Sequence, residues 1–295
     1  MSSCSALLCR IAIICLIVAA PVGAFAQTQA SCTFKVFQLP SDLDQAYGVN
    51  DYGTVVGKAL FPYPNPPEKG FIRYSNGSVS YYLPPNAADA WFTWRNNSGT
   101  SIGVYTATNA NTIAKGFMLN GSTFTSIVHP NAVWGTTLTG INKYNSIVGW
   151  YLDANENPHG FKRSSNGSFR TLQYGAGVTD TIPNGINDYG TIVGWYNNTY
   201  GFIFHNDAWA TLDWPKPTSG TELRGISNSG VIVGVSHDTQ QGTSFLYANG
   251  MFKVISVPNS FLTSVSGISP GGVIVGMTNL NGNQSGWRGF TATCH

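Results

Sequence analysis

Apolar and polar positions along the chain follow one pattern that recurs six times. In each copy, a polar turn rich in Asn, Asp, Ser and Gly leads into a short run that ends at glycine, and in five of the six copies two β-branched residues precede this glycine, as in GINDYGTIVG. Turn residues of this kind tolerate a positive φ or bond their own backbone, and a short β-branched run between turns is typical of a buried strand. Each copy therefore predicts the end of one strand, a tight turn and a buried second strand. The six copies span residues 48–57, 94–103, 140–149, 185–194, 225–234 and 267–276.

Two more strands are predicted after each copy. The third begins with Gly-Phe or Ser-Phe, as in GFIRYSNG, and its Asn-Gly ending is a strong signal for a hairpin. The fourth, as in MFKVISVP, often ends at proline, which suits a sheet edge. The last glycines of successive copies are 46, 46, 45, 40 and 42 residues apart. The sequence therefore predicts an all-β protein made of six units, each with four short antiparallel strands.

The sixth unit stops at GFTATCH, before any fourth strand, and the missing piece has a counterpart at the other end of the chain. TFKVFQLP, residues 33–40, closely resembles MFKVISVP, residues 251–258. In a linear array of units, a strand displaced to the other end of the chain would have no partner there. In a closed ring, the displaced strand can pair with the last unit and so remove the open sheet edges. We therefore predict a six-bladed β-propeller as a single domain over residues 33–295, preceded by a short lead of residues 27–32.

Residues 1–26 have the features of a secretory signal peptide. The apolar run IAIICLIVAA follows Arg10, and Ala24-Phe25-Ala26 matches an A-x-A cleavage site, so the mature chain is expected to begin at Gln27. The run is about half of the ~20 residues that a membrane-spanning helix needs. A secreted protein, extracellular or periplasmic, with no membrane span in its mature form is the resulting expectation.

Cleavage there would leave two cysteines, Cys32 and Cys294, at opposite ends of the mature chain. Aligned with an intact blade, they fall on either side of a hairpin turn, close enough to bond. An even pair in an exported chain indicates a disulfide, which would replace the covalent turn that the divided blade lacks.

The amino-acid composition of the chain argues against nucleic-acid binding and against a metal site. Only 9% of the residues are charged and the formal net charge is +2, which disfavours nucleic-acid binding through a basic surface. The five histidines are scattered without metal-binding spacing, and the Asp153-x-Asn155-x-Asn157 run departs from a calcium loop, so no metal or cofactor is expected.

The G-[IV]-[NS]-x-x-G-x-[IV]-V-G segments, each followed by a Gly-Phe strand, resemble the HAF family of bacterial extracellular repeat proteins. The family's His-Ala-Phe signature is approached here only by His159-Gly160-Phe161. The resemblance implies a repeat fold and an export route. It implies no reaction and no catalytic residues.

Candidate functional residues follow from the strand that precedes each turn, because innermost strands line the channel of a propeller. Alternation along these strands predicts two adjacent rings of side chains on the channel face. Asp42, Asp44, Asp89 and Asp180 are expected near the channel mouth. The first ring comprises Tyr47, Thr93, Thr139, Asn184, Arg224 and Ser266, and the second Gln45, Trp91, Thr137, Ile182, Glu222 and Ser264.

Two interpretations of these residues remain open. A glycan-active hydrolase or lyase could use Glu222 with Asp180 or Asp89 as its paired carboxylates, with Arg224 holding a substrate anion. Alternatively, Glu222 and Arg224 simply form an ion pair on one face of a strand. No convincing catalytic set emerges, so the sequence favours a non-catalytic protein.

Aromatic residues are the more suggestive set. Eight tryptophans are present, and flat aromatic faces beside Asn and Thr suit neutral sugars, although core packing is the alternative. Trp91, Trp94 and Trp134 are expected in loops between blades. The leading hypothesis is a secreted binding or scaffold module for glycans or cell-surface material, with a structural envelope or matrix protein as a further alternative. The candidate binding residues are Tyr47, Trp91, Trp94, Trp134, Asn184 and Arg224.

Overall fold

The computed structural model describes residues 28–39, 45–60, 67–108, 113–215, 220–239, 242–283 and 286–295. The predicted signal peptide, residues 1–26, lies outside this part of the chain, as do Asp42 and Asp44. Within the described residues, no helix is both long enough and apolar enough to cross a membrane.

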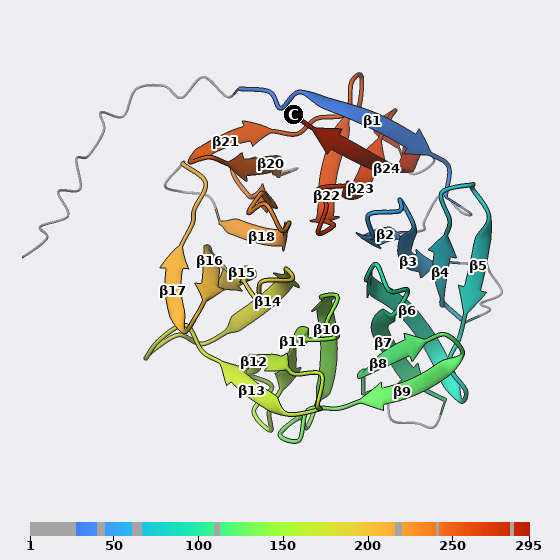
Figure 1. Cartoon of the computed structure of the whole chain (residues 1–295), viewed down its shortest axis with the longest axis vertical. Helices are drawn as coiled ribbons and strands as arrows, with labels where there is room; N and C mark the ends of the chain where they lie inside the picture. Colours follow the sequence, from blue (N-terminus) through green and yellow to red (C-terminus); the bar gives the residue numbers. More distant parts are fainter. Residues whose placement is uncertain are drawn as a thin grey trace, which may run out of the picture.

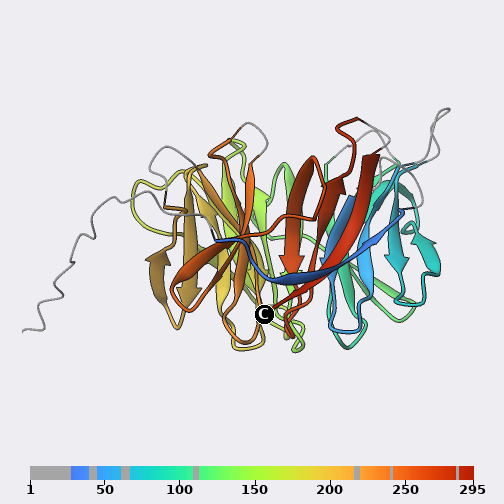
Figure 2. The ribbon, with the colours of Figure 1, turned by 90° about the horizontal axis from the view of Figure 1, so that it is seen from above.

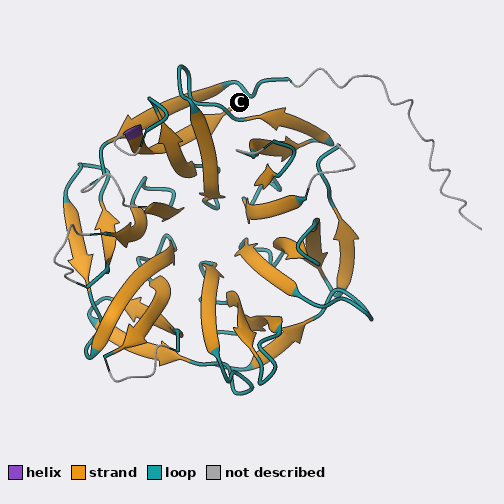
Figure 3. Ribbon diagram, turned by 180° about the vertical axis from the view of Figure 1, so that it is seen from behind, coloured by secondary structure: helices purple, strands orange, loops and turns teal. Residues whose placement is uncertain are grey.

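Six four-stranded antiparallel sheets surround a central axis (Figure 1), which confirms the predicted six-bladed β-propeller. Strands make up almost all of the regular structure (Figure 3). Blades 1 and 2 comprise β2 (Gln45–Val49), β3 (Val55–Ala59), β4 (Lys69–Arg73), β5 (Val79–Tyr82), β6 (Ala87–Arg95), β7 (Ser101–Ala107), β8 (Lys115–Asn120) and β9 (Thr123–Ile127).

The next three blades repeat this order from the axis outward. Blades 3, 4 and 5 comprise β10 (Gly135–Ile141), β11 (Ile147–Leu152), β12 (Pro158–Arg163), β13 (Phe169–Leu172), β14 (Thr181–Ile186), β15 (Ile192–Tyr196), β16 (Tyr200–His205), β17 (Ala208–Thr211), β18 (Thr221–Ile226), β19 (Ile232–Ser236), β20 (Thr243–Ala248) and β21 (Met251–Val254).

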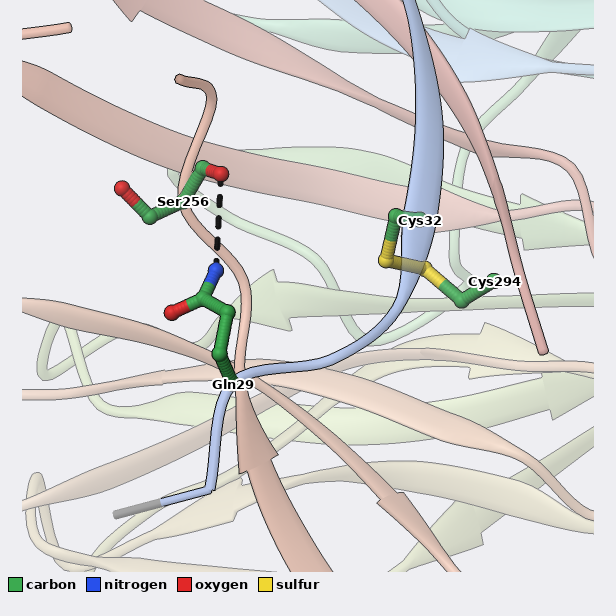
Figure 4. The surroundings of a disulfide bond; sticks show 4 residues. All are labelled: Gln29, Cys32, Ser256 and Cys294. Carbon is green, nitrogen blue, oxygen red and sulfur yellow. Dashed lines mark hydrogen bonds between the residues drawn. A yellow bond between two sulfur atoms is a disulfide. The ribbon is translucent and has the colours of Figure 1, made fainter. Parts of the chain in front are cut away.

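Blade 6 combines the two ends of the chain. It contains β22 (Leu262–Ile268), β23 (Ile274–Asn279) and β24 (Trp287–Cys294), and its outermost strand is β1 (Cys32–Phe37). Figure 2 shows β1 running along the outside of β24. The two strands pair antiparallel over six residue pairs that end with Cys32 opposite Cys294, and these cysteines form the predicted disulfide (Figure 4).

The residues that precede β1 are also fixed by hydrogen bonds to the body of the propeller. The amide of Ala30 donates to the carbonyl of Val254 at 2.8 Å, and the amide of Val254 donates to Thr28 at 2.9 Å, so the lead lies beside the outer strand of blade 5. The Gln29 side chain donates to the carbonyl of Ser256 at 3.5 Å (Figure 4). The amino-terminal segment therefore joins two blades, blade 5 through its lead and blade 6 through β1.

The core lies between successive blades. The β-branched pair divides between two clusters in the five repeats that have one. In blade 1, Val55 packs with residues of blade 6, while Val56 packs with Phe92 and Phe117 of blade 2. The phenylalanine that opens each third strand is fully buried in every blade, which explains the Gly-Phe pattern as a packing requirement. These phenylalanines are Phe71, Phe117, Phe161, Phe202, Phe245 and Phe290.

Candidate functional site

A β-bulge recurs at the same place in all six innermost strands. In β2, Ala46 pairs with Gly57 and Gly48 pairs with Val56, which leaves Tyr47 as the extra residue. Such a bulge changes the direction in which the extra side chain points. The extra residues of the six strands are Tyr47, Thr93, Thr139, Asn184, Arg224 and Ser266.

These six residues line a central cavity of about 390 Å³. Trp91 and Glu222, from the adjacent predicted ring, complete its wall together with Trp94. The structure thus brings together five of the six candidate binding residues. The size of the cavity falls within the range typical of small-molecule sites, and its lining combines three aromatic rings with six polar side chains.

Trp94 forms the floor of this cavity. It stands where the other five repeats have glycine, and its indole reaches from blade 2 past Gly48 to Gly267 of blade 6. A β-carbon on Gly48 would lie 3.0 Å from Cε3 of Trp94, and one on Gly267 would overlap the far edge of the indole. Glycine is therefore needed at both positions to make room for the ring, which is only 8% exposed.

Around the axis, the inner strands themselves come close together below the cavity. A β-carbon on Gly185 would lie 3.0 Å from the Cα of Gly225, and one on Gly225 would lie 3.3 Å from the Cα of Gly267. With Trp94 inserted into this narrow ring, the cavity is closed at that end. From there the cavity extends toward the side where the inner strands begin, where Trp91 and Glu222 line it.

Polar side chains in the cavity wall also connect the blades. The Thr139 hydroxyl donates to the carbonyl of Pro183 at 2.7 Å, and the Asn184 amide nitrogen donates to the carbonyl of Leu223 at 2.9 Å. Both bonds run from one blade to the next. Because the Thr139 hydrogen and one amide hydrogen of Asn184 are used in this way, the two side-chain oxygens and the second amide hydrogen of Asn184 are left to bond a ligand.

Glu222 and Arg224 form an ion pair in the wall, with Nη2 of the arginine 3.0 Å from Oε2 of the carboxylate. Arg224 also donates through Nη1 to the carbonyl of Val265 at 2.7 Å and to the hydroxyl of Ser264 at 3.1 Å. The guanidinium is therefore fixed by blade 6 and by its own strand. The pair neutralises the charge on this side of the cavity.

Another part of the wall is formed by Tyr47 of blade 1. Its hydroxyl donates to the side-chain oxygen of Gln45, and burial together with the negative charge of Glu68 raises its pKa to about 12. The phenol therefore stays protonated at neutral pH. Near the mouth, the Lys58 ammonium lies 5.1 Å from the centre of the Trp91 ring and 2.6 Å from the Glu68 carboxylate.

The other carboxylates proposed for catalysis do not lie in the cavity wall. Asp89 accepts a hydrogen bond from the backbone amide of Glu68 at 2.9 Å. Asp180 is 5% exposed at the start of blade 4, and one of its oxygens accepts a 3.4 Å bond from the Thr179 hydroxyl. Glu222 is therefore the one carboxylate among the described residues that line the cavity.

The expected loop location is wrong for two of the three tryptophans. Trp91 and Trp94 lie on β6, the innermost strand of blade 2, which is nine residues long. Trp134 does lie between blades, 48% exposed and just ahead of β10, where its indole donates to the carbonyl of Ala154 at 3.4 Å. It is the candidate binding residue that the structure leaves away from the central cavity.

No group of three or more His, Cys, Asp or Glu within the described part of the chain is placed to hold a metal ion. The feature that sequence reasoning missed is the role of Trp94 as a floor. Its signal was present, because WRNNSG begins with tryptophan where the aligned segments begin with glycine.

Comparisons with known proteins support the class of fold. No protein-family model matches the sequence, and no curated protein matches it significantly. Among solved structures, virginiamycin B lyase from Staphylococcus aureus is similar with a TM-score of 0.53 and 12% identity, over 89% of this chain and 99% of that one. A protein of unknown function from Dyadobacter fermentans has a TM-score of 0.53 and 9% identity, over 90% and 100% of the two chains.

YCF48 bound to a D1 peptide gives a TM-score of 0.50 at 12% identity, over 91% of this chain and 99% of that one. At such low identity, these similarities show the β-propeller fold alone. The molecule is thus a six-bladed propeller with a central cavity closed at one end.

Proposed function

We propose that the protein is a non-catalytic binding module that holds a neutral carbohydrate in its central cavity. The observation that carries the proposal is the chemistry of the wall. Aromatic rings line the cavity together with hydrogen-bond acceptors, the side-chain oxygens of Thr139 and Asn184, and both side chains also donate a hydrogen bond to the neighbouring blade. A sugar offers apolar C–H faces that pack on aromatic rings and hydroxyl groups that donate to such acceptors.

Charge supports a neutral ligand. The one guanidinium in the wall is already bound to Glu222 and to two groups of blade 6. An anion would have to compete for a cation that already donates three hydrogen bonds within the protein, and a cation would have to compete with Arg224 for the carboxylate. A second carboxylate, which glycoside hydrolysis needs, is missing among the described residues of the wall, and this favours binding over catalysis.

The setting of the proposed function is outside the cytoplasm. A disulfide that joins the two ends of the propeller and the lack of a membrane-spanning helix in the described residues fit an extracellular or periplasmic location. We propose that residues 1–26 direct this export and that the chain belongs to the HAF repeat proteins. The proposal rests on the apolar leader and on the six repeated turns.

A glycan array with the protein from Gln27 onward tests the proposal, followed by calorimetric titration of the strongest glycan. We expect binding, and we expect Trp91→Ala to weaken it by about tenfold or more because an aromatic wall is lost. Trp134→Ala is the matched control, since this exposed indole lies away from the cavity. The Trp134→Ala variant should bind the glycan with the same affinity as the unmodified protein.

Two results would count against a carbohydrate site. In the first, no glycan binds at high micromolar concentration. In the second, a glycan binds but Trp91→Ala leaves its affinity unchanged, which would place the ligand elsewhere on the molecule.

A further inference from the structure

A second, smaller cavity of about 210 Å³ lies between blades 4 and 5, beside the central one. Its wall combines an indole, an amide, a buried hydroxyl, a carboxylate and an imidazole. These groups belong to Trp195, Asn198, Thr221, Glu222 and His237. Glu222 lines both cavities, so one carboxylate separates them.

Backbone contacts hold the walls of this second cavity in place. The turn after β15 has two successive residues with positive φ, Asn197 at 49° and Asn198 at 53°, closed by a 3.1 Å bond from Thr199 to Tyr196. The amide of Thr221 donates to the carbonyl of Thr199 at 2.7 Å, which ties this turn of blade 4 to β18 of blade 5. The cavity is thus bounded by a fixed turn and not by a loose loop.

Gly220 completes this junction. The amide of His237 donates to its carbonyl at 2.9 Å, and a β-carbon on Gly220 would lie 3.3 Å from the imidazole and 3.5 Å from the carbonyl of Asn198. The missing side chain lets the turn of blade 4 approach the imidazole of blade 5. His237 itself is exposed, so its ring is available to a ligand.

The geometry of the repeat explains why an indole and a carboxylate meet here. Trp195 occupies the strand position that Lys58 occupies in blade 1, and Glu222 occupies the position of Trp91 in blade 2. Lys58 and Trp91 contact each other across their blade junction. At the junction of blades 4 and 5, the same two positions instead carry an indole and a carboxylate on either side of a cavity.

We propose that this cavity is a second sugar subsite and that the ligand is an oligosaccharide of at least two units. The inference rests on the proposed function of the central cavity. One unit lies in the central cavity, and the next packs against Trp195 with its hydroxyl groups bonded to Asn198 and His237. Glu222 stands between the two units and accepts hydrogen bonds from hydroxyls on either side.

Calorimetric titration with glucose, xylose and N-acetylglucosamine and with their β-1,4-linked oligomers of two to six units tests this inference. The α-1,4-linked glucose oligomers complete the panel. We expect oligomers to bind at least about tenfold more tightly than their monomers. Trp195→Ala and His237→Ala should remove this difference and leave monomer binding unchanged. Trp150→Ala, at the equivalent Gly-Trp-Tyr position of blade 3, is the matched control and should keep it.

Outcomes separate this inference from the proposed function. If oligomers bind no more tightly than monomers, or if both variants keep the difference, the second subsite is wrong while the central site stands. If no sugar of the panel and no glycan of the array binds the unmodified protein, both fall together. His237→Ala guards against a folding defect in Trp195→Ala, because its side chain is exposed and its removal leaves the core intact.

Discussion

At the scale of single residues, the packing of one indole among glycines determines the shape of the central cavity. Trp94 replaces the glycine of its repeat, and its indole fits between the inner strands because Gly48 and Gly267 carry no side chains. Tryptophan at this place both closes the channel and supplies an apolar surface to the cavity above it. The contact between Trp94 and Gly267 joins blades 2 and 6, which do not follow each other in the ring.

A double-mutant cycle tests this contact. Gly267→Ala should lower the free energy of unfolding by about 1–3 kcal/mol, because the added carbon overlaps the indole. Trp94→Ala should lower it by about 3–5 kcal/mol through the cavity that it leaves. In the Trp94→Ala background, Gly267→Ala should have little further effect, as measured by urea unfolding. Fully additive losses would contradict the packing described here.

A buried histidine makes stability depend on pH. His129 is 3% exposed, stacks on Tyr151 with ring centres 3.8 Å apart, and accepts a bond from the amide of Asn131 through Nδ1 at 3.2 Å. Burial, and to a lesser degree the charge of His159, lowers its pKa from 6.5 to about 4. Folding therefore holds the imidazole neutral in a range where the unfolded chain takes up a proton.

The sign of the effect follows from this difference. His129 contributes stability that is present above pH 6.5 and is lost as the pH falls toward 4, because the unfolded state binds more protons in that window. The loss should reach up to about 3 kcal/mol. Thermal unfolding from pH 7.5 to 4.5 should show a smaller loss in His129→Asn, which retains an acceptor for the turn. Parallel curves for the two proteins would refute the assignment.

At the scale of elements, the asparagine of the repeated turn connects each blade to the next. In blade 3, Oδ1 of Asn142 accepts the amides of Tyr144 and Ser146, and its Nδ2 donates to the carbonyl of Asn187 in blade 4 at 3.2 Å. Asn96 and Asn187 make the same bond to their neighbours at 3.1 Å. The [NS] position of the repeat is thus a turn cap, and where it is asparagine it is also a link between blades.

Substitutions at Asn142 should separate these two roles. Asn142→Ala leaves the two turn amides without their partner and removes the bond to the carbonyl of Asn187, which keeps its bond from the amide of Gly190. This should lower the free energy of unfolding by about 2–4 kcal/mol. Asn142→Ser should cost about half as much, because the serines at 227 and 269 cap their turns through the hydroxyl. Chemical denaturation measures both losses. An unchanged stability of Asn142→Ser would show that the link between blades contributes nothing, and equal losses for the two variants would show that the turn cap contributes nothing.

Most of the strands and their grouping into blades could be predicted from the sequence, because one strand pattern is repeated six times. The same alignment of the repeats also identified the residues that line the channel. The ring of residues from Tyr47 to Ser266 was predicted from the alternation of side chains along a regular strand, whereas in the structure each of these residues is the extra residue of a β-bulge. The cavity beside Trp195 could not be predicted. Its wall combines residues of two blades, including Asn198 and His237, which lie outside the repeated segments, and its volume depends on the side chains of both blades.

At the scale of the whole molecule, the ends of the chain close the ring. The displaced strand and the two cysteines indicated this closure, and β1 and the disulfide confirm it. The pairing of the lead with blade 5 had no sequence signal, because it uses backbone groups that any residues could supply. The molecule is thus closed twice, by strand pairing and by a covalent bond over a separation of 262 residues.

Removing the disulfide should lower the stability of the propeller and leave its ring of blades closed. Cys32→Ala combined with Cys294→Ala should lower the free energy of unfolding by about 2–5 kcal/mol, since the bond restricts the unfolded chain over a very long loop. The six residue pairs between β1 and β24 remain to hold the strand. Urea unfolding of the variant should match that of the reduced parent protein. A loss below about 0.5 kcal/mol would mean that strand pairing alone accounts for the closure.

The central claim is that a carbohydrate enters the cavity formed by the six bulged residues, and indole N–H resonances in a ¹H–¹⁵N NMR titration test it most directly. Each signal is assigned by a single Trp→Phe substitution, and the ligand is the strongest glycan of the array. We expect the signals of Trp91 and Trp94 to shift with saturation, while that of Trp134 stays unchanged. Saturable binding that leaves both Trp91 and Trp94 unperturbed would contradict the account.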